Sequence, residues 1–304
     1  MAYLHSDREQ FRDAIDLAYE QTGVMVQAIE KDYYVTMLLR LLAQKMSYIV
    51  FKGGTSLSKC HKVIRRFSED IDITIDTLLS QGQKKKIKQA IVDSAQELGM
   101  TIENLDETRS RRDYNRYVIA YDSVIPMASD ALKAAVLLET SYTAVSFPTV
   151  LLPVHSYIGD MMEQEAPDAI EEYNLNPFEM KVQGIDRTLA DKVFAVCDYY
   201  LQGKVTKHSR HLYDIYKLLP LVPQDENFRE LVKEVRAVRA QSVICPSALP
   251  EADVPELLEK IIKEKAYKQD YDSLTTQLLE ENMPYDTVIA ALKKVAESSL
   301  FENN

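Results

Sequence analysis

The chain has 304 residues, a length that allows one large domain or two smaller ones, each with a sizeable core. Its 46% apolar and 27% charged residues are ordinary for a globular protein, and its net charge of −11 argues against a protein that coats nucleic acid by charge alone. Three widely spaced cysteines, with no CxxC pair, argue against a disulfide framework and a structural zinc site. Without a signal-peptide pattern or a membrane-length apolar run, we expect a cytoplasmic protein.

The N-terminal quarter predicts two helices, a strand and a third helix. Ser6 and Glu9 form an S-x-x-E capping box for the first helix, and apolar residues at helical spacing predict the second over 24–45. The short apolar run "SYIVFKGG" (47–54) reads as a buried strand closed by glycines, and "SLSKCHKVIRR" (56–66) as a helix. "DIDITID" (70–76) alternates with period two and predicts a strand with its acids on one face.

The rest of the chain divides into a mixed part and a helical part. An amphipathic helix is expected before Gly99, followed by strands in "RYVIAYD" (116–122) and "KAAVLLETSY" (133–142). We expect residues 147–160 to be irregular and everything from about residue 176 to be helical. The sequence therefore predicts an α+β fold, with an α/β core and N-terminal helices over 1–160 and a mainly helical region over 161–304.

Two carboxylates, Asp70 and Asp72, stand on one face of the expected strand, about 7 Å apart at Cα. Carboxylates this close repel one another unless a cation lies between them, and Mg²⁺ prefers such oxygen ligands. Glu139, on another predicted strand, is a candidate third ligand. This trio suits metal-assisted chemistry on a nucleotide, although most acidic strand faces simply meet solvent.

The glycine pair fits the same interpretation. Gly53 and Gly54 end a strand and open a helix, so their backbone N–H groups are able to approach a phosphate closely. The Thr55 and Ser68 hydroxyls are candidates to bond phosphate oxygens. The stretch "GGTSLSKC" departs from both the P-loop and the dinucleotide-binding glycine patterns.

The ordered combination of strand, Gly-Gly-Thr, helix, Arg-Phe-Ser and D-x-D resembles the first motif of the AbiEii/AbiGii family of nucleotidyltransferase toxins. These are relatives of the MenT toxins in the polymerase-β-like superfamily. Downstream, "LADKVFAVCDYYLQGKVTKHSRHLYDIYKLL" (189–219) resembles the family's later lysine and R-D-x-x-D segment, and "IEKDYYVTMLLRLL" (29–42) is also similar. The resemblance spans most of residues 26–220. His211 departs from it, because many relatives have an acid there.

The resemblance implies a polymerase-β-like core with a small mixed sheet flanked by helices. It also implies a nucleotidyltransferase, dependent on Mg²⁺ or Mn²⁺, that moves a nucleoside monophosphate from an NTP to RNA, such as a tRNA 3′ end, and releases pyrophosphate. The biological setting would be a toxin–antitoxin or abortive-infection system in phage defence, with a cognate antitoxin as partner.

On these grounds we assign candidate residues to four roles. The catalytic set is Ser68, Asp70, Asp72, Lys192 and Asp214. Nucleotide binding is assigned to Gly53, Gly54, Thr55, Ser68 and Lys192, and metal binding to Asp70, Asp72 and Glu139. Candidate phosphate or RNA contacts are Lys59, Arg65, Arg66 and Arg210.

Each assignment has a plainer alternative. Lys192 on a helix is ordinarily a solvated lysine, and Asp214 is placed to pair with Arg210 at i, i+4. Basic stretches at 84–88, 109–116 and 204–211 usually form solvated faces, but two of them lining a cleft would be able to track an RNA backbone. A small-molecule acceptor, or a catalytically silent nucleotide-binding or protein-interaction module, remains the alternative function.

Overall fold

The computed structural model describes residues 2–68, 70–126 and 133–302. The chain forms two compact units, unit 1 from Met1–His61 and Ser68–Gln183, and unit 2 from Lys62–Phe67 and Gly184–Asn304. The backbone therefore crosses from one unit to the other three times, and unit 2 is built from two separate segments. Among the described residues, no helix combines the length and apolar character needed to cross a membrane.

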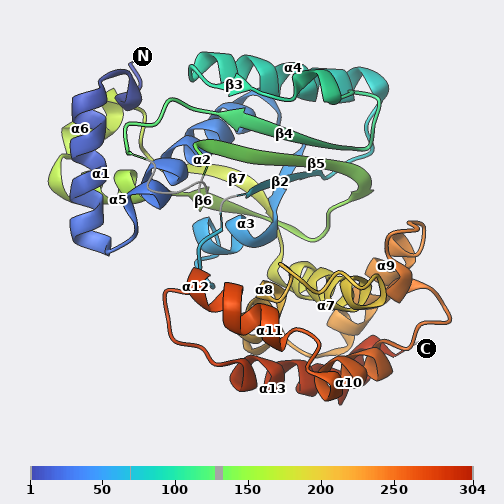
Figure 1. Ribbon diagram of the computed structural model, residues 1–304. Helices are drawn as coiled ribbons and strands as arrows, with labels where there is room; N and C mark the ends of the chain where they lie inside the picture. Colours follow the sequence, from blue (N-terminus) through green and yellow to red (C-terminus); the bar gives the residue numbers. More distant parts are fainter. Residues whose placement is uncertain (1, 69, 127–132, 303–304) are drawn as a thin grey trace. The chain divides into compact units, whose positions relative to one another are not determined.

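Unit 1 is organised around a mixed seven-stranded sheet in the order β3-β4-β5-β2-β1-β7-β6 (Figure 1). Neighbouring strands pair antiparallel except β2 with β5 and β1 with β7, which are parallel. The strands are β1 (Ile49–Lys52), β2 (Asp70–Ile75), β3 (Thr101–Ile102), β4 (Tyr114–Ala120), β5 (Ala135–Val145), β6 (Thr149–Val154) and β7 (Phe178–Gln183).

Strand β2 sits in the middle of the sheet and has two chemically different faces. Ile71, Ile73 and Ile75 point to one side and are at most 2% exposed, whereas Asp70 and Asp72 point to the other and are half-buried. This alternation is the one that the sequence predicts, and apolar burial on one face anchors the strand's register.

The helices of unit 1 lie around this sheet. They are the short turn η1 (Leu4–Ser6), α1 (Arg8–Thr22), α2 (Val26–Lys45), α3 (Gly53–Lys59), α4 (Gln81–Glu97), η2 (Leu105–Glu107), α5 (Tyr157–Glu165) and α6 (Pro167–Glu172). Helix α2 is buried on nearly every side because it packs against α1, α4, α5 and strand β5. Helices α1, α5 and α6 gather at one end of the sheet (Figure 1).

Four local expectations are wrong. The helix expected over 56–66 ends at Lys59, and the residues after it leave the helical conformation. The segment 147–160 is not irregular but contains β6, an edge strand, where Pro153 is tolerated because one side of such a strand needs no ladder partner. Strand β7 lies inside the region expected to be helical, and its side chains alternate in burial. Helix α1 is capped by Asp7, whose carboxylate accepts from the Glu9 and Gln10 N–H groups, and not by Ser6.

Unit 2 is helical apart from its first segment. Its helices and turns are α7 (Ile185–Leu201), α8 (Arg210–Leu218), η3 (Leu219–Leu221), α9 (Glu226–Arg239), η4 (Pro246–Ala248), α10 (Val254–Glu264), α11 (Lys268–Asp270), η5 (Tyr271–Thr275), α12 (Thr276–Leu278), α13 (Tyr285–Ala296) and η6 (Ser299–Phe301). Helix α7 packs against α8, α9 and α10. Segment 62–67 is held by backbone pairing with residues 278–280.

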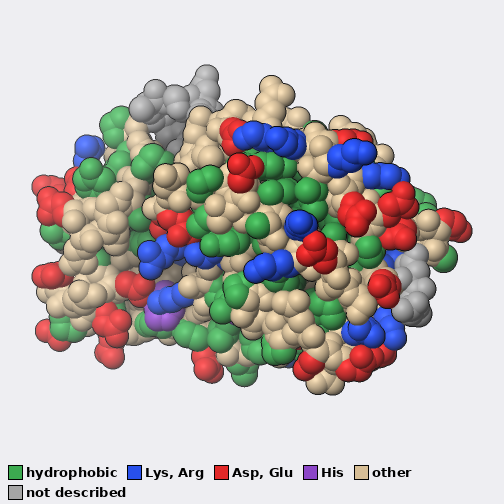
Figure 2. Space-filling model, turned by 90° about the horizontal axis from the view of Figure 1, so that it is seen from below, with side chains coloured by type: hydrophobic (Ala, Val, Ile, Leu, Met, Phe, Trp, Pro, Cys, Tyr) green, Lys and Arg blue, Asp and Glu red, His purple; other side chains and the backbone are tan. Residues whose placement is uncertain are grey.

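The surface reflects a chain with 36 Lys and Arg residues against 47 Asp and Glu residues. On the face shown in Figure 2, acidic and basic side chains are interspersed among apolar ones. Over the described part of the chain, this face therefore carries no large patch of a single charge.

The two candidate caps of α1 make a direct test. We expect Asp7→Ala to lower the free energy of unfolding by about 1 kcal/mol, because two N–H groups lose their acceptor. The matched control Ser6→Ala should change it by less than about 0.5 kcal/mol. Urea unfolding of both variants provides the measurement, and equal losses would contradict the assignment of the cap to Asp7.

Candidate active site

A row of four charged side chains crosses the accessible face of the sheet in unit 1. Lys52 on β1 pairs in register with Asp72 on β2, Asp72 with Glu139 on β5, and Glu139 with Arg116 on β4. Residues directly opposite each other on neighbouring strands project to the same face. Asp70, two residues before Asp72, shares that face. The sheet thus places all three expected metal ligands on one surface.

The acidic members of this row are open to solvent. Glu139 is 34% exposed, and its carboxylate lies 3.7 Å from the Nε of Arg116. Burial, followed by the charge of Glu139, raises the pKa of neighbouring Tyr114 to about 12, so this phenol stays protonated at neutral pH. Glu139 and Asp72 are therefore held beside one another on a face that a charged ligand is able to reach.

Gly53 brings the backbone directly against Asp72. Its φ of +80° lies in the left-handed region, and a Cβ there would stand 1.9 Å from the Asp72 Oδ2. Only glycine fits both constraints. The turn that follows β1 is therefore able to offer main-chain N–H groups next to a carboxylate, as the expected nucleotide-binding role of Gly53 and Gly54 requires.

Thr55 and Ser68 tie this turn to the start of β2. The buried Thr55 hydroxyl donates to the Asp70 carbonyl oxygen at 2.6 Å and lies 2.9 Å from the Ser68 hydroxyl. This hydrogen bond fixes the position of the first turn of α3 relative to Asp70 on β2. The Thr55 hydroxyl thus has a structural partner, and Ser68 is brought to the same corner of the site.

The donor chemistry fits a hard divalent cation that is only partly held by protein. Among residues 2–68, 70–126 and 133–302, no three His, Cys, Asp or Glu side chains are grouped closely enough to hold a metal ion. Asp70, Asp72 and Glu139 are thus not a preassembled three-ligand cage. Two or three carboxylates on one face, beside a glycine turn, match the way Mg²⁺ takes few protein ligands and completes its shell with phosphate oxygens and water.

Lys192 lies in unit 2 and is buried, with 6% of its surface exposed. Its ammonium donates to the Asp214 Oδ2 at 2.6 Å. The guanidinium of Arg66 binds both oxygens of the same carboxylate, at 2.7 and 2.8 Å. The interpretation of Lys192 as a solvated helix residue is therefore wrong, because its charge is held inside a three-residue ion network.

Opposing effects set the protonation of this network. Burial by itself would raise the pKa of Asp214, but the charges of Arg66 and Lys192 outweigh burial and hold it far below the usual range. Burial lowers the pKa of Lys192, and Asp214 opposes that change. The geometry thus surrounds one buried carboxylate with two basic side chains.

His211 occupies the place where the family resemblance leads us to expect an acid. Its Nδ1 lies 3.5 Å from the Lys192 ammonium, and its ring stacks parallel to that of Tyr199. Burial and then the charge of Lys192 keep the pKa of His211 well below its usual value, so the imidazole is neutral at pH 7. Asp214 is thus accompanied by a neutral ring instead of a second anion. Arg210, the first residue of α8, is half-exposed beside it.

The remaining basic candidates have different surroundings. Lys59 is buried, and its ammonium binds the Asp32 carboxylate inside unit 1. Arg65 is exposed, while its backbone N–H donates to the Tyr213 hydroxyl in unit 2. Of these two, only Arg65 presents its charge to solvent.

Two members of the sheet row were not among the sequence candidates. Lys52 flanks Asp72, and Arg116 flanks Glu139. Lys52 is the last residue of β1, immediately before the glycines. An antiparallel pairing of this strand with the acidic strand β2 would have pointed to Lys52, because it places Lys52 opposite Asp72. Arg116 was visible only as part of a basic stretch.

A glycine substitution tests the close approach at Asp72. Gly53→Ala and the control Gly23→Ala both place a side chain at positive φ, which costs about 1–2 kcal/mol. No atom lies within 4 Å of a Cβ at Gly23, so we expect Gly53→Ala to lose at least about 1 kcal/mol more through its collision with Asp72. Denaturant unfolding measures the difference, and equal losses would refute the predicted collision.

Asp214→Asn tests the ion network. Removing the shared anion leaves two buried cations and should destabilise the protein by about 3–5 kcal/mol. Because the pKa of Asp214 is lower in the folded state than in the unfolded chain, its contribution is present above about pH 4 and is lost as the pH falls further.

Urea unfolding between pH 6 and pH 3 would show this as a steeper acid loss of stability in the parent protein than in Asp214→Asn. Glu251→Gln, which changes an exposed carboxylate in unit 2, is the control and should keep the parent slope. Parallel curves for the parent and Asp214→Asn would count against the network.

Two comparisons with known proteins bear on the family and the fold of this chain. A family model described as nucleotidyl transferase AbiEii toxin, type IV toxin–antitoxin system, matches residues 36–291. Among solved structures, the chain is similar to MenT4, a nucleotidyltransferase toxin from Mycobacterium tuberculosis H37Rv, with a TM-score of 0.51 and 15% identity. The alignment covers 93% of this chain and 88% of MenT4, which supports the fold. No curated protein matches the sequence. The chain belongs to the AbiEii family of nucleotidyltransferase toxins.

Proposed function

We propose that this nucleotidyltransferase moves a nucleoside monophosphate from an NTP to a hydroxyl of RNA, with a tRNA 3′ end as the acceptor, and releases pyrophosphate. The observation that carries the proposal is the register that aligns Asp72 with Glu139 on one accessible face, with the Gly53 backbone against Asp72. Carboxylates beside a glycine turn suit a nucleotide substrate, because the carboxylates would bind the metal ion while the backbone of the turn would bind the phosphates.

Asp70 and Asp72 would hold Mg²⁺ or Mn²⁺, with Glu139 as a further ligand. The bound cation would supply positive charge that neutralises the phosphoryl oxygens during transfer. The backbone of Gly53, Gly54 and Thr55 would position the phosphates, and Ser68 would contact them from the start of β2. The tie between Thr55 and the Asp70 carbonyl supports this arrangement, because it keeps the turn and the acids in fixed register.

We assign Lys192 to the triphosphate. A buried ammonium oriented by Asp214 is a compact, preorganised charge of the kind that stabilises a leaving pyrophosphate. Arg66 binds both oxygens of the Asp214 carboxylate, so Asp214 and Arg66 act as positioning residues. Arg65 and Arg210 are proposed phosphate or RNA contacts because they are at least partly exposed.

The biological role proposed here follows from the family. The AbiEii description names a toxin of a type IV toxin–antitoxin system, and we infer a cognate antitoxin and a role in abortive infection of phage-infected cells. We also propose a cytoplasmic location, because the proposed substrates, NTP and tRNA, are found in the cytoplasm.

Nucleotide transfer to RNA is tested by incubation with total tRNA and each radiolabelled NTP in turn. We expect one or more NTPs to label tRNA when Mg²⁺ is present, and excess EDTA to stop labelling. Asp70→Asn should lower the rate by about 100-fold or more, because a charge that acts on the transition state is lost. The control Asp93→Asn changes an exposed acid on α4 and should keep full activity. Equal labelling by the parent and Asp70→Asn would reject the assigned site.

A further inference from the structure

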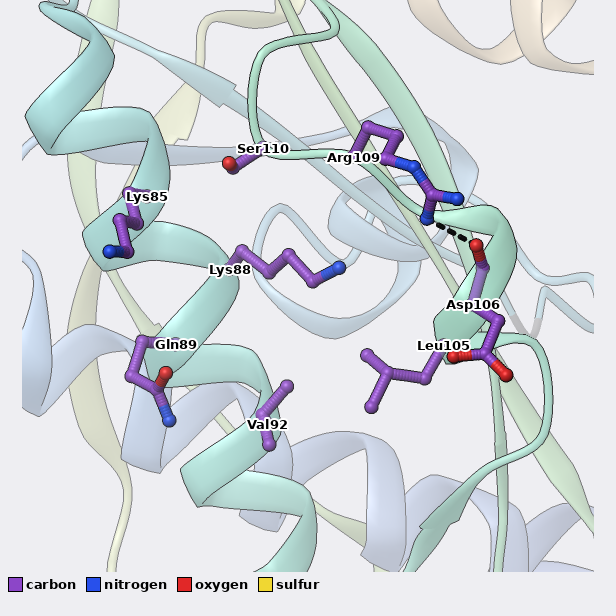
Figure 3. A pocket seen from close by; sticks show the side chains of 8 residues that line it. All are labelled: Lys85, Lys88, Gln89, Val92, Leu105, Asp106, Arg109 and Ser110. Carbon is purple, nitrogen blue, oxygen red and sulfur yellow. Dashed lines mark hydrogen bonds between the residues drawn. The ribbon is translucent and has the colours of Figure 1, made fainter.

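A pocket lies in unit 1, where two of the three basic stretches meet. Helix α4 and the loop that follows β3 enclose a pocket of about 430 Å³, within the range of about 300–1,000 Å³ of small-molecule sites. Lys85, Lys88 and Val92 line it from α4, and Leu105, Asp106 and Arg109 line it from the loop. In Figure 3 the Lys88 side chain extends from the helix across the hollow toward the loop.

The loop side of the pocket is held in a fixed shape. The buried amide of Asn115 accepts from the Arg109 N–H at 2.8 Å and donates to the Arg109 carbonyl at 3.0 Å. The Arg109 guanidinium binds the carbonyls of Asp106 and Thr108, the first drawn as a dashed line in Figure 3. Lys88 donates to the Thr108 carbonyl at 2.9 Å and so joins the helix to the loop. The side chains of Lys88 and Arg109 are therefore held in place before a ligand binds.

The lining of the pocket carries more positive than negative charge. It has three cationic side chains and one carboxylate. Lys84, one turn before Lys88 on α4, is paired with Asp113 and does not belong to the lining. A cationic lining in a chain of net charge −11 points to a function in binding anions.

Two apolar side chains accompany these charges. Val92 and Leu105 give the pocket a partly apolar wall. Cations for a phosphate backbone, with apolar groups for sugar or base, are a combination that single-stranded nucleic acids use. An acidic protein segment would need the cations but not the apolar wall.

We propose that the pocket between α4 and the 105–110 loop binds backbone phosphates of the RNA acceptor, away from the reacting carboxylates. This proposal rests on the proposed function, since it names a contact surface for that acceptor. Lys85, Lys88 and Arg109 bind the phosphates, and the apolar surfaces at Val92 and Leu105 pack against sugar or base.

The test compares RNA binding by the parent protein and by a triple variant carrying Lys85→Gln, Lys88→Gln and Arg109→Gln. Fluorescence anisotropy with a labelled single-stranded oligoribonucleotide gives the affinity over a range of salt concentrations. Each lost phosphate contact lowers the salt slope by about 0.7, so the triple variant should lose about 2 in slope and on the order of tenfold or more in affinity. A charge-matched control replaces Lys260, Lys268 and Lys293, whose ammonium groups form surface ion pairs, and should behave as the parent.

Lys88 and Arg109 also hold the loop, so a second variant guards against misfolding. Among the described residues, Lys85 makes no hydrogen bond or ion pair, and Lys85→Glu should weaken RNA binding while circular dichroism and unfolding stay unchanged. In the transfer assay, the pocket variants should raise the KM for RNA and keep kcat and Mg²⁺–NTP affinity. Unchanged RNA affinity in both variants would reject the pocket as an RNA-binding site. The proposed function would still stand in that case if the parent protein labels tRNA.

Other ligands are separated by competition. One outcome is that the parent protein binds inorganic phosphate or tripolyphosphate but no RNA, and that the pocket variants lose this phosphate binding. This result would assign the pocket to free phosphate and reject the proposal. Polyglutamate that competes as strongly as RNA of equal charge would assign it to an acidic protein partner and also reject the proposal. A parent protein that neither binds nor labels RNA would refute both the pocket and the RNA acceptor.

Discussion

The buried carboxylate of Asp214 is the interaction on which unit 2 depends. Asp214 belongs to α8, and its carboxylate binds Arg66 from the 62–67 segment and Lys192 from α7. Charges removed from water are costly unless each keeps close partners, and this carboxylate supplies partners to both cations. Two basic side chains from separate parts of the sequence thus share one buried carboxylate, and the neutral imidazole of His211 lies beside them.

Unit 1 places its charges in a different way. Strand β2 uses its period of two to bury isoleucines on one side and to present Asp70 and Asp72 on the other. The same residues that hold the strand in the centre of the sheet thereby hold the acids in place. Gly53 adds the backbone that these acids face, and it does so only because it lacks a side chain. The proposed metal ligands Asp70 and Asp72 therefore stand on a central strand, which holds them in a fixed position.

Local pattern predicted the elements whose signal is contained in a few residues. The alternation of 70–76 predicted β2 and its acidic face, and the helix before Gly99 was recognised from its periodicity. Strand β7 was missed because six alternating residues after Asn176 and Pro177 are a weak signal, and its parallel partner β1 is distant in the chain.

Partners that are far apart in sequence could not be predicted in the same way. Lys192 is buried because Arg66 and Asp214, 148 positions apart, meet beside it. Likewise, alternation predicted the face of Glu139 but not its alignment with Asp72, which depends on strand register. That alignment, and the meeting of two basic stretches at one pocket, required coordinates.

The two-segment construction of unit 2 has a consequence for how the protein is made. Arg66 leaves the ribosome early, but its carboxylate partner follows 148 residues later, and its backbone partner Leu279 later still. Chains fold from the N-terminus as they are synthesised, so a nascent or truncated chain has the acidic strand long before the lysine network is complete. A nascent chain of this toxin family member therefore cannot complete unit 2 until nearly the whole polypeptide has been synthesised.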